Sequence, residues 1–114
     1  MPTKPNILVL CGRNKQRSKT AEEIFKQDQR FEIRSAGVSA SADKKLHTRD
    51  LAWADLVLVM ESDQRDKIIE IFGRDIPKII VLHIPDEYAY MDPELIAMLS
   101  DSINDILQSE FNIT

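Results

Sequence analysis

The sequence predicts an α/β fold, a three-layer sandwich in which helices cover both faces of a four-stranded parallel sheet of strand order 2-1-3-4. The alternation of two kinds of segment along the chain predicts this class. Short apolar runs alternate along the chain with longer segments in which apolar residues recur every three or four positions. Strands that are separated by helices are joined by right-handed crossovers, which makes the strands parallel. The chain has 114 residues, enough for a single hydrophobic core, so we expect one domain over 1–114.

Four apolar runs are predicted to be the strands. They cover 6–10, 31–36, 55–60 and 78–82. The first run is apolar on both faces, which is typical of a strand inside a parallel sheet rather than at its edge. The small residues at 38–42 are expected to form a loop after the second strand.

Four segments are predicted to be helices. They cover 18–27, 43–51, 62–72 and 92–108. Ser62 is expected to cap the third helix and Gly73 to end it, while Asp92 followed by Pro93 is a typical helix start. The residues expected to face the core from the first, third and fourth helices are Ala21, Ile24, Phe25, Ile68, Ile69, Phe72, Leu95, Met98, Leu99, Ile103, Ile106 and Leu107.

Composition argues against several functional classes. Hydrophobic residues make up 43% and charged residues 30% of the chain, and no apolar stretch approaches the roughly 20 residues that cross a bilayer. A net charge of −4 argues against general affinity for nucleic acids or membranes. The single cysteine cannot form an internal disulfide, and the N-terminus lacks a signal-peptide core, so we expect a cytoplasmic protein. His47 and His83 lack the spacing of metal ligands, and we expect neither a metal nor a cofactor.

The most informative motif surrounds Cys11, which follows the first predicted strand. Five residues separate it from Arg17. A loop between a strand and a helix presents several backbone N–H groups to one point, and the helix start adds partial positive charge. The planar guanidinium of Arg17 can bind two phosphate oxygens at once. Such groups also favour the thiolate, the form of cysteine that acts as a nucleophile. The motif therefore predicts a phosphate-binding loop with Cys11 positioned to attack phosphorus; the alternative is a buried cysteine that only packs at the strand end.

The other residues of this loop are predicted to bind substrate. Basic residues gather around the cysteine of an otherwise acidic chain, a distribution that suits a small anion better than a polyanion. Asn14 can adopt a left-handed backbone conformation and brace the loop. Ser18 can donate its hydroxyl to the thiolate or cap the helix. The predicted substrate-binding residues of the loop are Gly12, Arg13, Asn14, Lys15, Gln16 and Ser18.

Five segments of the chain resemble, in order, those of the low-molecular-weight protein tyrosine phosphatases. They read Cys-Gly-Arg-Asn-Lys-Gln-Arg-Ser at 11–18, Ser-Ala-Gly at 35–37, Thr-Arg-Asp-Leu at 48–51, Ala-Asp-Leu-Val-Leu-Val-Met-Glu at 54–61 and Ile-Pro-Asp-Glu-Tyr at 84–88. The resemblance spans nearly the whole chain. It implies hydrolysis of phosphate monoesters in two steps through a phosphocysteine.

The resemblance also implies a general acid near the C-terminus, because the leaving oxygen must be protonated by a carboxylic acid from another segment. Asp86 and Asp92 are the candidates. Asp92 has a role as the cap of the last predicted helix, whereas Asp86 has none and follows the fourth strand on a loop, so we predict that Asp86 is the acid. Tyr88, and less directly Tyr90, are expected to flank the entrance as an aromatic wall; the alternative is that they pack against the last helix.

The chain departs from the family pattern at several positions. Arg13 stands where the family has a glycine, and Gln16 stands where it commonly has a second cysteine. Little sequence remains between Gly37 and Thr48, where family members carry a longer helix and an aromatic pocket wall. The shorter segment predicts a shallower, more open pocket with less selectivity for tyrosine.

These observations together predict a cysteine-dependent phosphomonoesterase of the protein tyrosine phosphatase type. Its expected partners are a phosphotyrosine protein or a small aryl phosphate, with inorganic phosphate or another oxyanion in the loop, and no nucleic acid or membrane. Two alternatives stay open. A relative with weak catalysis would bind phosphate or a phosphoprotein, and an arsenate reductase on the same fold would need an external thiol because the chain has one cysteine.

Overall fold

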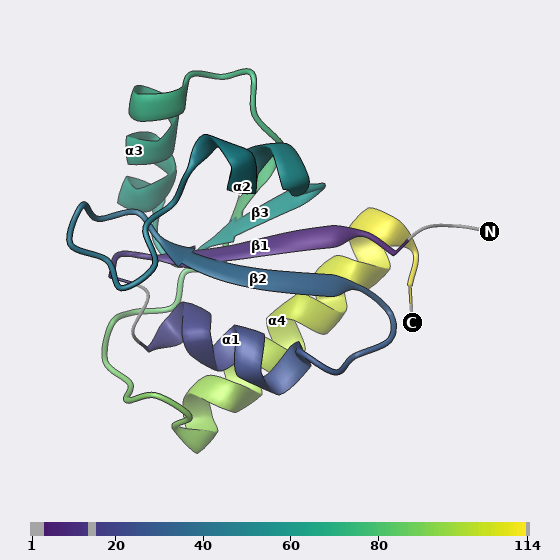
Figure 1. Ribbon diagram of the computed structural model, residues 1–114. Helices are drawn as coiled ribbons and strands as arrows, with labels where there is room; N and C mark the ends of the chain where they lie inside the picture. The colour runs from purple at the N-terminus through teal and green to yellow at the C-terminus, as the bar shows by residue number, and fades with distance from the viewer. Residues whose placement is uncertain (1–3, 14–15, 114) are drawn as a thin grey trace.

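A four-stranded parallel sheet forms the middle layer of the molecule (Figure 1). The computed structural model describes residues 4–13 and 16–113. The strands are β1 Asn6–Cys11, β2 Glu32–Gly37, β3 Leu56–Val59 and β4 Ile79–Val81. Their order across the sheet is β2-β1-β3-β4, which confirms the predicted order and the interior position of the first strand.

Helices cover both faces of this sheet, as predicted. They are α1 Arg17–Phe25, α2 Thr48–Trp53, α3 Ser62–Phe72 and α4 Pro93–Phe111. In Figure 1, α1 and α4 lie on one side of the strands while α2 and α3 lie on the other. None of the helices in the described part of the chain is long and apolar enough to cross a membrane.

The alternation of side chains along β1 divides the core into two layers. Ile7 and Val9 belong to the cluster that includes the buried faces of α1 and α4, whereas Leu8 and Leu10 belong to the cluster that includes α2 and α3. All four side chains are fully buried, and each contributes roughly 1.5–3 kcal/mol by its removal from water. A strand buried on both faces holds its carboxyl end, where Cys11 lies, in a fixed position.

The second helix differs from the prediction of 43–51, because it begins at Thr48. Lys45 instead pairs with Gly37 as a short parallel extension beside β2. The N–H of Gly37 donates to the carbonyl of Lys44 at 2.7 Å, and the N–H of Leu46 donates to the carbonyl of Gly37 at 2.9 Å. These backbone hydrogen bonds compete with the helical ones, so the helix starts only after the segment leaves the sheet edge.

Several helix ends also differ slightly from the prediction. The first helix, expected over 18–27, covers Arg17–Phe25. The residue that caps α3 is Glu61 rather than Ser62. The last helix extends to Phe111 and ends at Asn112, whose backbone is left-handed with φ 54°. Gly73 ends α3 with φ 82°, as predicted, because glycine adopts positive φ without a side-chain clash.

Candidate active site

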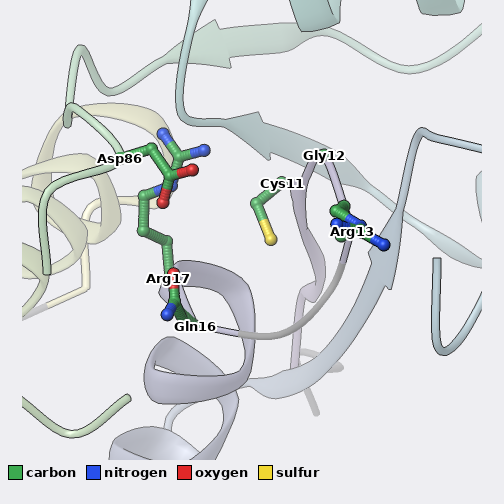
Figure 2. A pocket seen from close by; sticks show the side chains of 6 residues that line it. All are labelled: Cys11, Gly12, Arg13, Gln16, Arg17 and Asp86. Carbon is green, nitrogen blue, oxygen red and sulfur yellow. The ribbon is translucent and has the colours of Figure 1, made fainter. Parts of the chain in front are cut away.

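Cys11 lies at the carboxyl end of β1, between the ends of β2 and β3. In a parallel α/β sheet, ligands bind at this edge, at the point where successive connections run to opposite sides of a central strand. A cavity of about 240 Å³ opens there. Its lining residues, shown in Figure 2, are Cys11, Gly12, Arg13, Gln16, Arg17 and Asp86. Five of these six come from the predicted phosphate loop, and Asp86 joins them from a distant segment.

The thiol of Cys11 is buried beside a hydroxyl. Its side chain is 3% exposed, and its Sγ atom lies 3.0 Å from the Oγ atom of Ser18. Ser18 is the second residue of α1 and is fully buried. A hydroxyl that donates a hydrogen bond to sulfur stabilises the thiolate, so the pair is suited to a nucleophilic role.

The first part of the phosphate loop is fixed by the segment that follows β2. The carbonyl of Cys11 accepts from the N–H of Val38 at 2.9 Å, and that of Gly12 accepts from the N–H of Ser39 at 2.7 Å. The carbonyl of Arg13 accepts from the N–H of Asp43 at 3.1 Å. Segment 38–43 therefore serves as the support of the loop, a role that sequence reasoning did not assign to it.

Gly37 allows this support to lie against the loop. A Cβ atom at Gly37 would clash with the Cβ atom of Ala42 and would lie 2.9 Å from the carbonyl oxygen of Gly12. Such separations are shorter than van der Waals contact, so a side chain here must displace the loop or its support.

We expect Gly37→Ala to weaken the binding of inorganic phosphate by about tenfold, equivalent to about 1.4 kcal/mol, because the loop shifts. The overpacked site should also lower the free energy of unfolding by about 1–3 kcal/mol. Isothermal titration calorimetry and urea denaturation measure the two effects. Gly73→Ala is the matched control. An alanine at its φ of +82° is strained and should lower the free energy of unfolding, but no atom lies within 4 Å of the added Cβ. Equal phosphate affinity in the two variants would contradict this account.

Arg17 is buried and held by groups from the segments that follow β3 and β4. Its side chain is 5% exposed. Its Nη1 atom donates to Oε2 of Glu61 at 3.0 Å and to the carbonyl of Ile84 at 2.7 Å. Its Nε atom lies 3.9 Å from Oδ1 of Asp86. A buried guanidinium requires such partners, and these contacts orient it beside the thiol (Figure 2).

Glu61 is itself positioned by a buried amide. Oε1 of Gln64 accepts from the N–H of Met60 at 2.9 Å and from the N–H of Glu61 at 3.1 Å. Gln64 is 6% exposed, so the turn between β3 and α3 is held from inside. Sequence reasoning did not name Glu61 or Gln64 as site residues, although an acidic residue directly after a parallel strand was an available signal.

Asp86 and Asp92 have different surroundings. Asp86 lines the cavity with a side chain that is 64% exposed. The segment before it continues along β3, because Ile84 donates its N–H to the carbonyl of Met60 at 3.0 Å. Asp92 caps α4, where its Oδ1 accepts from the N–H of Glu94 at 2.9 Å, and it does not line the cavity. This arrangement favours Asp86 as the candidate acid.

The remaining predicted residues divide into three groups. Asn14 and Lys15 lie outside the residues that the structure describes. Tyr88 does not line the cavity and packs against the core cluster that includes α1 and α4. Its burial, with the nearby carboxylates of Glu94, Glu87 and Asp92, raises the pKa of its phenol above the usual value. Tyr90 is 49% exposed, and of the described residues that line the cavity none is aromatic.

The described residues of the site offer no evident place for a metal ion. In residues 4–13 and 16–113, no three His, Cys, Asp or Glu side chains are grouped as metal ligands would be. The arrangement instead combines a thiol, a buried guanidinium and an exposed carboxylate around one cavity. These are the groups needed to bind a tetrahedral dianion, attack it and protonate a departing oxygen.

Comparison with known proteins establishes the fold. No known family's sequence model matches the chain, and no curated protein matches it in sequence. Its structure is similar to a low-molecular-weight protein tyrosine phosphatase from Streptococcus pyogenes, with a TM-score of 0.74, 18% identity and coverage of 96% of this chain and 97% of that one.

Two further solved structures have the same fold. The tyrosine phosphatase Wzb from Escherichia coli K30, in complex with phosphate, has a TM-score of 0.73 and 24% identity over 95% of this chain and 99% of that one. The YwlE arginine phosphatase from Geobacillus stearothermophilus has a TM-score of 0.67 and 22% identity over 96% and 97%. The fold predicted from the sequence, that of the low-molecular-weight protein tyrosine phosphatases, is therefore confirmed.

Proposed function

We propose that this chain is a phosphatase that hydrolyses phosphate monoesters through a phosphocysteine. One observation carries the proposal: the thiol of Cys11, 3.0 Å from the Ser18 hydroxyl, lines the same cavity as Arg17 and Asp86. The fold is shared with phosphatases, one of them in complex with phosphate. A free catalytic thiol suits the reducing conditions of the cytoplasm, where we place the activity.

In the first step, the thiolate of Cys11 attacks phosphorus, and the bond from phosphorus to the leaving oxygen breaks. Asp86 donates its proton to that oxygen, so the leaving group departs as a neutral alcohol or phenol. Arg17 and the N–H groups of the loop bind the remaining phosphoryl oxygens, whose charge is redistributed in the transition state. Because Arg17 is already oriented by Glu61 and Ile84, little reorganisation is needed during the reaction.

In the second step, water attacks the phosphorus of the phosphocysteine. The carboxylate of Asp86 accepts a proton from that water, the sulfur–phosphorus bond breaks, and Cys11 returns to the thiolate as inorganic phosphate leaves. The carboxyl group thus acts first as an acid and then as a base. Its exposed position at the cavity supports this role, because both the leaving group and the water must reach it.

We propose aryl phosphates as substrates, either phosphotyrosine in proteins or small phenyl esters. Gly12, Arg13 and Gln16 line the cavity and are proposed to contact the substrate. Ser18 is buried beside the thiol and is proposed to act on the substrate through Cys11; Asn14, Lys15 and Tyr88 remain predictions. Nucleic acids and membranes are not proposed as partners of this acidic chain. The chain has one cysteine, so it lacks a second thiol to relay electrons, and arsenate reduction is not proposed.

We expect Asp86→Asn to lower kcat for para-nitrophenyl phosphate by about 10²-fold, the lower end of the range for general acid–base catalysis. The pH–rate profile of the variant should also differ in shape from that of the parent, because a group that transfers a proton during the reaction shapes one limb of that profile. Steady-state rates measured across a pH series test both effects. Asp92→Asn is the matched control, because Asp92 only caps α4, so it should change stability while the pH profile keeps its shape.

Two outcomes would count against this function. If Asp86→Asn and Asp92→Asn had the same pH profile, Asp86 would not be the acid. If the parent protein bound phosphate or vanadate without any turnover, the chain would be a phosphate- or phosphoprotein-binding relative of phosphatases instead of an enzyme.

A further inference from the structure

The cavity is lined by two arginines whose side chains differ in what they contact. Arg17 is 5% exposed and donates from Nη1 to Glu61 and to the carbonyl of Ile84. Arg13 is exposed, and its side chain has no hydrogen bond or ion pair with any residue that the structure describes. The charge of Arg13 is therefore available to a ligand, whereas Arg17 is already held by protein groups.

The backbone of Arg13 is nevertheless held in place. Its carbonyl accepts from the N–H of Asp43 at 3.1 Å, and the preceding carbonyl of Gly12 accepts from the N–H of Ser39 at 2.7 Å. Figure 2 shows Arg13 on the opposite side of the Cys11 thiol from Arg17 and Asp86. The Arg13 guanidinium thus extends from a fixed point on the rim, well separated from the group that binds the phosphoryl oxygens.

The nearby carboxylates do not neutralise this arginine. In the part of the chain that the structure describes, the carboxylates of Glu61 and Asp86 form ion pairs with Arg17, and Asp63 lines a neighbouring cavity that also contains Lys67. Asp43, whose backbone supports Arg13, has its carboxylate 3.9 Å from Nζ of Lys19. The rim beside Arg13 therefore keeps a positive charge, although the whole chain carries −4.

We propose that Arg13 binds a second anionic group of the substrate. The preferred substrates are then phosphate monoesters that carry a carboxylate or another phosphoryl group near the ester. This group is either part of a small molecule or an acidic side chain beside a phosphorylated residue. Among the described residues that line this cavity, Arg13 is the cation that no protein group holds, which suits one extra anionic group and not a polyanion. The inference rests on the proposed phosphatase activity, whose substrate class it narrows.

The test compares carboxyphenyl phosphate with carbamoylphenyl phosphate, in both the meta and the para series. The two esters have nearly the same shape and differ in charge. For each protein, the preference is the kcat/KM of the carboxy ester divided by the kcat/KM of the carbamoyl ester. The preference of the parent should exceed that of Arg13→Gln by a factor of about three to ten. A factor of this size lies between the free energy contributed by an exposed ion pair and that of a charge-assisted hydrogen bond. Division of the two ratios removes the difference between the leaving groups, and added salt should reduce the effect.

Two variants serve as controls. Arg13→Lys keeps the charge and should keep part of the preference. Arg74→Gln removes an exposed arginine from the segment that precedes β4, at the edge of the sheet away from Cys11, and should leave the ratio as in the parent. A peptide pair with Asp or Asn beside the phosphotyrosine distinguishes an acidic side chain from a small-molecule source of the second anion.

Binding measurements separate this inference from the proposed activity. Carboxyphenylphosphonate and carbamoylphenylphosphonate cannot be hydrolysed, so their affinities can be compared by calorimetry even if the parent shows no turnover. Arg13→Gln should selectively weaken binding of the carboxy compound by a similar factor. If the parent and Arg13→Gln showed the same preference for the carboxy compounds, in both rates and affinities, the proposal would be overturned. If the parent showed no turnover but bound the carboxyphenylphosphonate more tightly than Arg13→Gln does, only the enzymatic function would be overturned.

Discussion

Replacing Cys11 by serine should abolish turnover of para-nitrophenyl phosphate while inorganic phosphate still binds in the cavity. The substitution changes one atom in a side chain that is 3% exposed, so the loop should keep its shape. A serine hydroxyl stays protonated near neutral pH and is a weak nucleophile unless a base activates it. The described part of the cavity offers one carboxylate, that of Asp86, which is needed in its protonated form for the first step.

Two measurements accompany the rate assay for Cys11→Ser. Rapid acid or alkaline quenching of the parent during turnover should trap a phosphoryl group on Cys11. The group is detected as a mass increase of about 80 daltons, which should be absent in the variant. Calorimetric titration with phosphate should show binding to both proteins. A serine variant with the full activity of the parent would disprove nucleophilic catalysis by Cys11.

The second large effect is expected for Arg17→Lys. A lysine keeps a positive charge but loses the planar pair of donors that can bind two phosphoryl oxygens at once. It also cannot contact Glu61, Ile84 and the phosphoryl group with the geometry that the buried guanidinium has. Arginines that stabilise phosphoryl transfer contribute about 10³–10⁵-fold to the rate, so we expect kcat/KM to fall by about 10³-fold or more.

Glu61→Gln shows how much of this effect depends on orientation. The amide oxygen can still accept from Nη1 of Arg17, but the charge of the carboxylate is lost. We expect a clearly smaller reduction in kcat/KM than for Arg17→Lys, with phosphate affinity retained. Steady-state kinetics and phosphate titration of both variants provide the comparison. Wild-type kinetics for Arg17→Lys would show that the guanidinium is not required.

Sequence patterns close together along the chain were sufficient for most of the fold. The strands and three of the four helices follow from hydrophobic periodicity and from end signals such as Asp92 with Pro93. The second helix was misplaced, because Lys45 pairs with Gly37 across the sheet edge. That pairing depends on where β2 ends in space, which no local pattern records.

The candidate site also has one part that local sequence patterns predict and another that they do not. The sequence by itself determined that Cys11, Arg17 and Ser18 are close together, since a short loop from a strand into a helix leaves them little freedom. Only the tertiary structure decided what surrounds them. Glu61 lies 44 positions from Arg17 and Ile84 lies 67 positions from it.

The physical reason is the order of the sheet. With β1 in the interior, the carboxyl ends of β3 and β4 lie on one side of the phosphate loop, and the segment after β2 lies on the other. The first group supplies the partners of Arg17 and the carboxylate of Asp86, while the second supports the backbone of Arg13. Chain-local forces shape the loop, and long-range strand pairing determines which distant residues complete it.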